Sequence, residues 1–199
     1  SGSVSADGKW VAFLDASPTS PNDVWVMTIE GTKVKRLTEM NPAVSSLQFG
    51  AVEKIRWSAS DGLPIEGVLL KPTNYVAGER YPLVVEIHGG PQWTWWYGWQ
   101  CSWHEWAQVL ANNGVVVLLP NPRGSEGHGW RFADKNFQDW GGNDFQDIMS
   151  GVDYLVEQGI ADPERMGIGG WSYGGYMTAW AVTQTNRFKA AVAGAGLSD

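Results

Sequence analysis

The sequence predicts an α/β fold, in which an antiparallel meander of strands is followed by a doubly wound sheet. From residue 83 onward, short apolar runs alternate with longer helix-like segments, which is typical of parallel strands connected by helices on both faces of a sheet. Before residue 42 the pattern differs, because short strand-like runs follow one another with only turns between them. Hydrophobic residues make up 43% of the 199 residues, which is enough for a folded core.

The first segment, residues 1–42, contains three strand patterns separated by turn signals. The turn signals are Asp7-Gly8 and Glu30-Gly31. The strands are expected at residues 10–14, 24–29 and 34–38. This meander resembles one blade of a β-propeller, with a three-stranded edge sheet as the alternative. The Pro- and Ser-containing connection at residues 41–47 indicates a boundary, so we expect one domain over 1–42 and another over 43–199.

The second segment begins with a hairpin, whose strands at 53–57 and 63–71 flank the turn Ser60-Asp61-Gly62. The elements expected after it are a strand at 83–87, a helix at 102–113, a strand at 115–119, a helix at 145–158, a strand at 166–169, a helix at 173–185 and a strand at 190–193. The strand at 166–169 is expected in the centre of the sheet. Folds of this kind bind ligands at the carboxyl ends of such strands.

The residues after that central strand, Gly170-Trp171-Ser172-Tyr173-Gly174, fit the G-x-S-x-G pattern of a nucleophile elbow. A serine hydroxyl becomes reactive only when a base takes its proton and a fixed turn presents it. Gly170 and Gly174 have no Cβ, so the strand and the helix beside the turn can approach closely. The pattern predicts Ser172 as the nucleophile of an α/β-hydrolase, with a plain glycine turn as the alternative.

A glycine pair lies at the end of the strand at 83–87, in the sequence His88-Gly89-Gly90-Pro91. It resembles the loop that donates a main-chain N–H to the oxyanion in α/β-hydrolases. We expect the two donors to be the main-chain N–H groups of Gly90 and of Tyr173, the residue after the nucleophile. We expect His88 to hold the glycine loop by a hydrogen bond, in preference to the alternative role of catalytic base.

Taken together, the motifs resemble the prolyl oligopeptidase family of serine peptidases (S9), and within it the acylaminoacyl-peptidase and dipeptidyl-peptidase-like branch. The matching stretches follow the family's order from about residue 50 to residue 199. They are HGGP at 88–91, PNPRGS at 120–125, DWGG at 139–142, DPERMGI at 162–168 and GWSYGGYM at 170–177. The resemblance implies a hydrolase domain that follows a β-propeller. It also implies hydrolysis of short peptides by acyl transfer through Ser172.

The acid and the base of the catalytic triad have no counterpart in the sequence. In this fold the order along the chain is Ser, then Asp or Glu, then His. No histidine follows Ser172, and the only acidic residue after it is Asp199. The resemblance places Asp199 at the end of the strand after the nucleophile helix, which is not the position of the triad acid. We therefore expect a sheet that is incomplete at its C-terminus, a triad Asp and His beyond residue 199, and no activity from these 199 residues alone.

Two other functions fit the same motifs, a carboxylesterase of the same fold and a non-catalytic α/β-hydrolase-like module that acts in binding. The formal net charge of −7 argues against a broad surface for nucleic acid, and no apolar run is as long as a membrane span. We expect a short peptide as partner, no nucleic acid, no membrane, no cofactor and no metal. A homo-oligomer of the full-length protein stays open. The single cysteine, Cys101, excludes an intrachain disulfide, and a cytoplasmic location is favoured over a periplasmic one.

Several other residues are of types that can bind a ligand or take part in catalysis. His104 and His128 lack metal-ligand partners at a useful spacing. Arg123 is expected to form an ion pair that orders its loop, with binding of a substrate carboxylate as the alternative. Asp144 and Asp147 are expected to interact favourably with the dipole of the helix at 145–158, near its start, and to have no catalytic role. For six tryptophans after the glycine loop we expect an interface, with one or two near residues 92–96 lining a pocket; they are Trp93, Trp95, Trp96, Trp99, Trp103 and Trp106.

Overall fold

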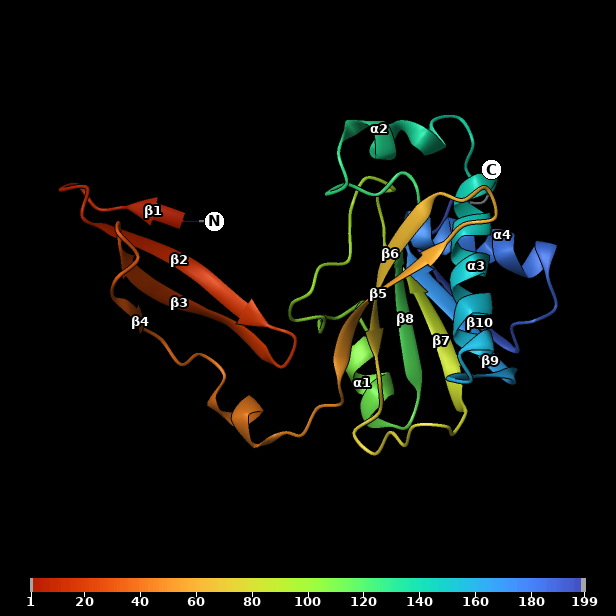
Figure 1. The fold of residues 1–199 in the computed structure, drawn as a ribbon, viewed down its shortest axis with the longest axis horizontal. Helices are drawn as coiled ribbons and strands as arrows, with labels where there is room; N and C mark the ends of the chain where they lie inside the picture. Colours follow the sequence, from red (N-terminus) through yellow and green to blue (C-terminus); the bar gives the residue numbers. More distant parts are fainter. Residues whose placement is uncertain (1, 198–199) are drawn as a thin grey trace. The chain divides into compact units, whose positions relative to one another are not determined.

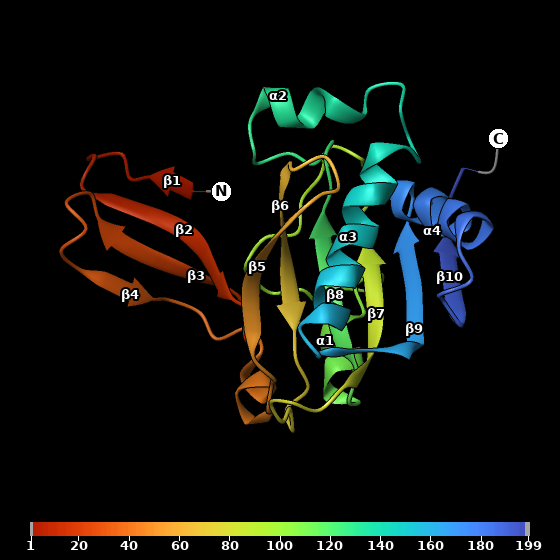
Figure 2. The same ribbon diagram turned by 45° about the vertical axis from the view of Figure 1, so that its right-hand side comes forward.

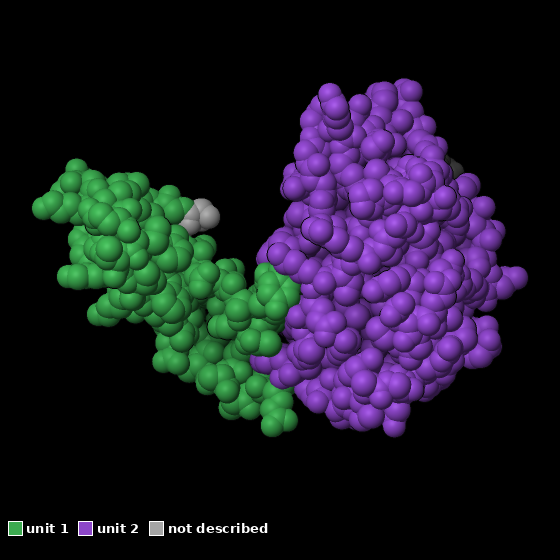
Figure 3. Space-filling view, viewed as in Figure 1, with its two compact units in different colours: residues 1–48, 97–100 green, residues 49–96, 101–199 purple. Residues whose placement is uncertain are grey.

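The computed structural model describes residues 2–197, and the chain divides into two compact units. One unit comprises residues 1–48 with 97–100, and the other comprises residues 49–96 with 101–199 (Figure 3). Figure 1 follows the elements in chain order. Asp199 lies outside the described residues. Within the described part of the chain, no helix has the length and apolar character needed to cross a membrane.

The smaller unit contains a four-stranded antiparallel sheet in the order β1-β2-β3-β4. Its strands are β1 (Gly2–Val4), β2 (Trp10–Ser17), β3 (Ser20–Thr28) and β4 (Val34–Arg36). Three of them correspond to the predicted meander, and β1 is a fourth strand that the sequence pattern did not reveal. The buried carboxylate of Asp23 fixes the chain after β4, because it pairs with Arg36 and accepts hydrogen bonds from Thr38 Oγ1 (2.7 Å) and the Met40 N–H (3.0 Å).

The larger unit is built on a six-stranded sheet in the order β10-β9-β7-β8-β6-β5 (Figure 2). Four strands are parallel: β7 (Tyr81–Ile87), β8 (Val116–Asn121), β9 (Ala161–Trp171) and β10 (Ala190–Gly194). The predicted hairpin of β5 (Val52–Ser58) and β6 (Pro64–Leu70) adds two antiparallel strands at one edge, so the sheet is mixed. Because β9 lies between β7 and β10, Ser172 follows a strand with a parallel neighbour on each side.

Helices cover both faces of this sheet. The core under α3 (Asn143–Glu157) and α4 (Tyr173–Gln184) is separate from the core under α1 (Ala107–Asn112). Strand β8 shows the division: Val116 and Leu118 belong to the first core, whereas Val117 and Leu119 belong to the second. Successive side chains of a strand point to opposite faces, so the two cores lie on opposite sides of the sheet. The predicted doubly wound architecture is confirmed.

Two segments differ from the prediction. The helix expected at 102–113 begins only at Ala107, because the carboxylate of Glu86 accepts the N–H of Trp106 (3.0 and 3.2 Å) at that point. His104 therefore lies before the helix and not in it. The loop between β8 and α3 contains two short helices that the sequence pattern did not reveal, α2 (Trp130–Ala133) and the 3-10 helix η2 (Asp134–Asn136). A further 3-10 helix, η1 (Pro42–Ser46), lies in the predicted connection between the two segments.

Candidate active site

Ser172 occupies the turn between β9 and α4, with φ 58° and ψ −117°. A positive φ is uncommon for a residue with a side chain and costs about 1–3 kcal/mol, so the surroundings must hold it in place. The Ser172 N–H donates to the carbonyl of Gly194 (2.9 Å), and the Ser172 carbonyl accepts the N–H of Tyr176 (3.0 Å). The side chain is exposed. The turn thus presents a hydroxyl in the way that a nucleophile requires.

Glycines make this turn sterically feasible. A Cβ at Gly170 or at Gly174 would overlap the carbonyl oxygen of Ile87 at the end of β7. A Cβ at Gly175 would overlap the carbonyl oxygen of Gly194 at the end of β10. The close approach of β7 accounts for both glycines of the G-x-S-x-G pattern, and the close approach of β10 accounts for the glycine that follows it.

The glycine loop after β7 lies beside the nucleophile. A Cβ at Gly89 would lie 3.4 Å from the Cβ of Ser172. Gly90 has a φ of 116°, which side chains rarely allow, and it lines one cavity of about 180 Å³ together with Ser172. Tyr173 begins α4, so its N–H lies at the positive end of that helix. The three residues predicted to take part in the reaction, Ser172, Tyr173 and Gly90, therefore meet at the carboxyl edge of the sheet.

His88 is buried, and both of its ring nitrogens have partners. Nδ1 lies 2.6 Å from the carbonyl oxygen of Gly89, and Nε2 lies 2.9 Å from Ser125 Oγ. Since a carbonyl can only accept, Nδ1 carries the proton. The Ser125 hydroxyl has one proton for two acceptors, His88 Nε2 and the carbonyl oxygen of Pro122 (2.7 Å). Burial lowers the pKa of His88 to about 4, so the ring is neutral. His88 has the expected role of holding the loop, and it has no free nitrogen for the role of catalytic base.

Aromatic rings form the wall of the nucleophile cavity. Trp93 and Trp95 line it, as expected for this part of the tryptophan-rich segment, and His104 and Trp171 line it too. The ring of His104 stacks on Trp171 with centroids 6.2 Å apart, and Trp103 meets both rings edge-on at 4.5 and 4.8 Å. The sequence pattern predicts no role for the side chains of His104 and Trp171. The position of Trp171, directly before the nucleophile, is the signal that could have revealed it.

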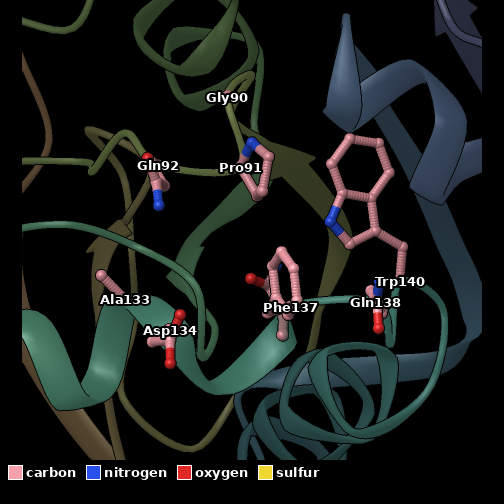
Figure 4. Close-up of a pocket in the computed structure, with 9 residues that line it drawn as sticks. Gly90, Pro91, Gln92, Ala133, Asp134, Phe137, Gln138 and Trp140 are labelled. Atoms are coloured by element: carbon pink, nitrogen blue, oxygen red, sulfur yellow. The ribbon is translucent and has the colours of Figure 1, made fainter.

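A second cavity, of about 670 Å³, also borders Gly90. Figure 4 shows the rings of Pro91, Phe137 and Trp140 around it, with Asp134 at one end. Most of its wall comes from residues 133–140, the segment of η2 and the turn after it. The sequence pattern predicts no role for this segment, because it has no periodicity. Its last residues, Asp139 and Trp140, belong to the family stretch DWGG at 139–142, to which no function was assigned.

A buried carboxyl on β7, that of Glu86, borders the nucleophile cavity. Burial raises its pKa to about 7; the N–H of Trp106 opposes that rise and the nearby Glu105 adds to it. The main-chain carbonyl of Glu86 accepts the Nε1–H of Trp95 (3.1 Å). Glu86 therefore ties two parts of the tryptophan-rich segment to the strand that carries the glycine loop.

Arg123 is bound to carboxylates of the chain itself. Its Nε and Nη2 donate to the two oxygens of Asp147 (2.8 and 2.7 Å), and its main-chain N–H donates to Asp147 as well (2.8 Å). Nη1 and Nη2 donate to Asp61 (2.9 and 3.0 Å). Arg123 and Asp147 are buried, whereas the Asp61 side chain is 49% exposed. The predicted ion pair is confirmed. The fork of the guanidinium is occupied, so a substrate carboxylate is not its partner.

Asp144 is fully buried at the start of α3. Its Oδ1 accepts the N–H groups of Gly141 (2.9 Å) and Phe145 (2.8 Å), and its Oδ2 accepts the hydroxyl of Tyr173 (2.6 Å). Burial raises the pKa of Asp144 and also that of Tyr173. The expected contact with the start of the helix is present. The bond to the residue after the nucleophile is an addition that sequence spacing did not indicate.

Across residues 2–197, no three side chains of His, Cys, Asp or Glu are arranged to hold a metal ion. The absence of a cofactor stays a prediction. The chemistry that the described residues can supply is that of an exposed hydroxyl on a strained turn, next to main-chain N–H groups at a helix start and a glycine loop.

Sequence comparisons relate this geometry to known proteins. Residues 99–199 match the prolyl oligopeptidase family. The uncharacterized peptidase YuxL of Bacillus subtilis (strain 168) is 38% identical over 199 residues, which are 99% of this chain and 30% of that protein. Dipeptidyl-peptidase 5 of Schizosaccharomyces pombe is 37% identical over 155 residues, which are 77% of this chain and 22% of that protein.

Two solved structures match over 96% or more of this chain. The acylaminoacyl peptidase of Pyrococcus horikoshii, in its orthorhombic crystal form, matches with a TM-score of 0.85 and 32% identity, over 100% of this chain and 31% of that one. A puromycin-hydrolyzing peptidase of Mycobacterium tuberculosis matches with a TM-score of 0.83 and 31% identity, over 96% and 30%. These matches confirm the predicted fold class. The chain spans less than a third of the length of each of these relatives.

Proposed function

The chain belongs to the prolyl oligopeptidase family, and from this premise we propose that it supplies the nucleophile and the oxyanion-binding amides of a serine peptidase that cleaves short peptides. One observation carries the proposal: Ser172 is held at φ 58°, exposed, in a strand-to-helix turn that glycines allow and beside the loop of Gly89 and Gly90. Backbone strain of this kind clusters at active sites.

In the proposed reaction, Ser172 Oγ attacks the carbonyl carbon of the scissile peptide bond while a base accepts the hydroxyl proton. The carbonyl oxygen becomes an oxyanion, and the N–H groups of Tyr173 and Gly90 donate to it. Losing one such donor typically costs about 3–4 kcal/mol of barrier. The tetrahedral intermediate then expels the amine, which takes the proton from the base, and the acyl group stays on Ser172 until water releases it.

The base in this proposal is not His88, because its two ring nitrogens contact the Gly89 carbonyl and the Ser125 hydroxyl. The family resemblance implies a histidine and an aspartate in sequence after residue 199, and we assign the roles of base and acid to them. On this proposal the 199 residues alone turn over no peptide. The resemblance also supports the assignment of residues 1–42 to the end of a β-propeller and of residues 43–199 to the catalytic domain.

The two cavities that share Gly90 support binding of a peptide on both sides of the scissile bond. The smaller one holds the nucleophile and has aromatic walls, and the larger one is bordered by Pro91, Phe137 and Trp140. Cavities with such walls favour apolar side chains next to the bond that is cleaved. A short peptide is the proposed substrate class, and the names of the relatives, dipeptidyl-peptidase and acylaminoacyl peptidase, agree with it.

The test uses the natural-length protein that contains this chain, with aminoacyl, acylaminoacyl and dipeptidyl p-nitroanilides as amide substrates and p-nitrophenyl butyrate as an ester. We expect hydrolysis of at least one anilide and a loss of about 10⁴–10⁶ in kcat for Ser172→Ala. Thermal unfolding should change little, because the lost hydroxyl is exposed. Ser150→Ala is the matched control, since that hydroxyl lies on α3 and donates to the carbonyl of Gln146.

Two outcomes would contradict the proposal. Undiminished anilide hydrolysis by Ser172→Ala would remove Ser172 from the reaction. Turnover of the ester with no turnover of any anilide would make the protein a carboxylesterase of the same fold.

A further inference from the structure

The side chain of Tyr173 has a partner that the proposed reaction does not use. Its hydroxyl donates to Oδ2 of Asp144 at 2.6 Å, and both side chains are buried. Tyr173 is also the residue whose main-chain N–H is a proposed oxyanion donor. One residue therefore connects a buried carboxylate to the place where negative charge develops.

Asp144 is itself held rigidly. Its other oxygen, Oδ1, accepts the N–H groups of Gly141 and Phe145, which belong to the turn before α3 and to the first turn of that helix. A carboxylate with three donors around it has a single favourable orientation. The phenol of Tyr173 is therefore anchored to the start of α3, an element separate from the turn of Ser172.

Tyr173 also contacts Trp140, a residue in the wall of the larger cavity. The ring of Trp140 meets the ring of Tyr173 edge-on, with centroids 5.1 Å apart. The carbonyl of Trp140 accepts the hydroxyl of Tyr176 (3.0 Å). Trp140 lies in the short segment that ends at Asp144, so this segment and α4 are joined by ring packing and by two hydrogen bonds from tyrosine hydroxyls.

The conformation of Ser172 explains why such an anchor matters. A non-glycine residue keeps a positive φ only when its surroundings determine it from several sides. The bonds from the Ser172 N–H to Gly194 and from the Tyr176 N–H to Ser172 hold one side of the turn. The peptide between Ser172 and Tyr173 carries the proposed oxyanion N–H, and the Tyr173 side chain holds that peptide from the other side.

We propose that Asp144 is a positioning residue, which acts through the phenol of Tyr173 to orient the Tyr173 N–H toward the oxyanion. This inference rests on the proposed function. It assigns no direct contact with substrate to Asp144. It requires that the loss of the hydrogen bond lowers kcat more than it changes KM, because an oxyanion donor acts in the transition state and little in the ground state.

The first test compares Tyr173→Phe with Tyr81→Phe in the natural-length protein, with an anilide substrate. Tyr81 is the matched control: it is buried and its hydroxyl accepts the N–H of Val76 (2.8 Å), but it lies at the start of β7, at the opposite end of the strand from the glycine loop. We expect Tyr173→Phe to lower kcat by about 10- to 100-fold with little change in KM. We expect Tyr81→Phe to lower thermal stability comparably and to leave kcat unchanged. Equal kcat values for the two variants would overturn the proposal.

The second test is a double-mutant cycle of Asp144→Ala and Tyr173→Phe. If Asp144 acts through the phenol, the kcat of the double variant should equal the lower of the two single-variant kcat values. Losses of kcat that multiply in the double variant would show that Asp144 acts by another route, and would overturn the proposal. If Asp144→Ala does not fold, Asp144→Asn takes its place, because an amide keeps one oxygen for the N–H groups of Gly141 and Phe145.

These results are separate from the test of the nucleophile. If Ser172→Ala keeps full activity, the proposed function fails. If Ser172→Ala is inactive and Tyr173→Phe has full kcat, only the positioning role of Asp144 fails.

Discussion

The buried ion pair of Arg123 and Asp147 gives a sharp prediction for stability. Both side chains are buried, and three hydrogen bonds of 2.7–2.8 Å run from Arg123 to the Asp147 carboxylate. Arg123→Met removes two of them and keeps only the bond from the main-chain N–H. The carboxylate is then a buried charge without its counter-charge. Breaking a buried pair in this way typically costs about 3–5 kcal/mol, a large part of the roughly 5–15 kcal/mol that stabilises a domain.

Two companion variants separate the causes. Asp61→Asn should have a much smaller effect, because the Asp61 side chain is about half exposed and water can replace its bonds to Arg123. In the double variant Arg123→Met/Asp147→Leu no buried charge is left, so much of the loss should be recovered. A residual cost of about 1–3 kcal/mol is expected, because the Arg123 main-chain N–H loses its acceptor.

The assay is urea unfolding followed by tryptophan fluorescence and circular dichroism at constant pH. Trp57 is a useful reporter, because its Nε1–H donates to the carbonyl of Asp147 (2.9 Å). If Arg123→Met lowers the unfolding free energy no more than Asp61→Asn does, the guanidinium does not have the structural role that its contacts indicate. A double variant less stable than Arg123→Met would refute the reasoning about the uncompensated charge.

The remaining predictions concern the elbow and the buried carboxyl beside it. Gly170→Ala should lower both kcat and thermal stability, because the added Cβ would overlap the carbonyl oxygen of Ile87. Gly167→Ala, on the same strand, should be tolerated, because its Cβ would make only ordinary contacts at 3.5 Å. Equal tolerance of the two variants would contradict the packing argument. Between pH 4.5 and about 7 the folded protein keeps a proton on Glu86 that the unfolded chain has released, so stability falls as pH rises through this window. In Glu86→Gln the stability difference between pH 5 and pH 8 should shrink by about 3 kcal/mol, and an unchanged difference measured by urea unfolding at the two pH values would contradict the raised pKa.

The sequence predicted those features that depend on neighbours along the chain. The order of strands and helices follows from local periodicity, and the elbow follows from glycine spacing around Ser172. The close contacts of Gly170 and Gly174 with Ile87 give that spacing its physical cause. The loop-holding role of His88 was also accessible, because the histidine directly precedes the glycines that it fixes.

Features that join distant parts of the chain were not predictable. The start of α1 depends on a hydrogen bond between Glu86 and Trp106, which are 20 residues apart. Helix propensity, a property of the local sequence, does not predict such a bond. The bond from Tyr173 to Asp144 spans 29 residues, whereas the sequence pattern predicts only that Asp144 lies near the start of a helix. The stack of His104 on Trp171 depends on the course of an irregular segment, which no periodicity describes.

The central claim is that Ser172 is an activated nucleophile, and covalent labelling tests it most directly. The natural-length protein is treated with a fluorophosphonate, which reacts with activated serines, and the modified residue is located by mass spectrometry of its peptides. We predict a single adduct, on Ser172, that forms in parallel with the loss of anilide hydrolysis. An adduct on another serine, or a complete loss of activity with Ser172 unmodified, would contradict the claim.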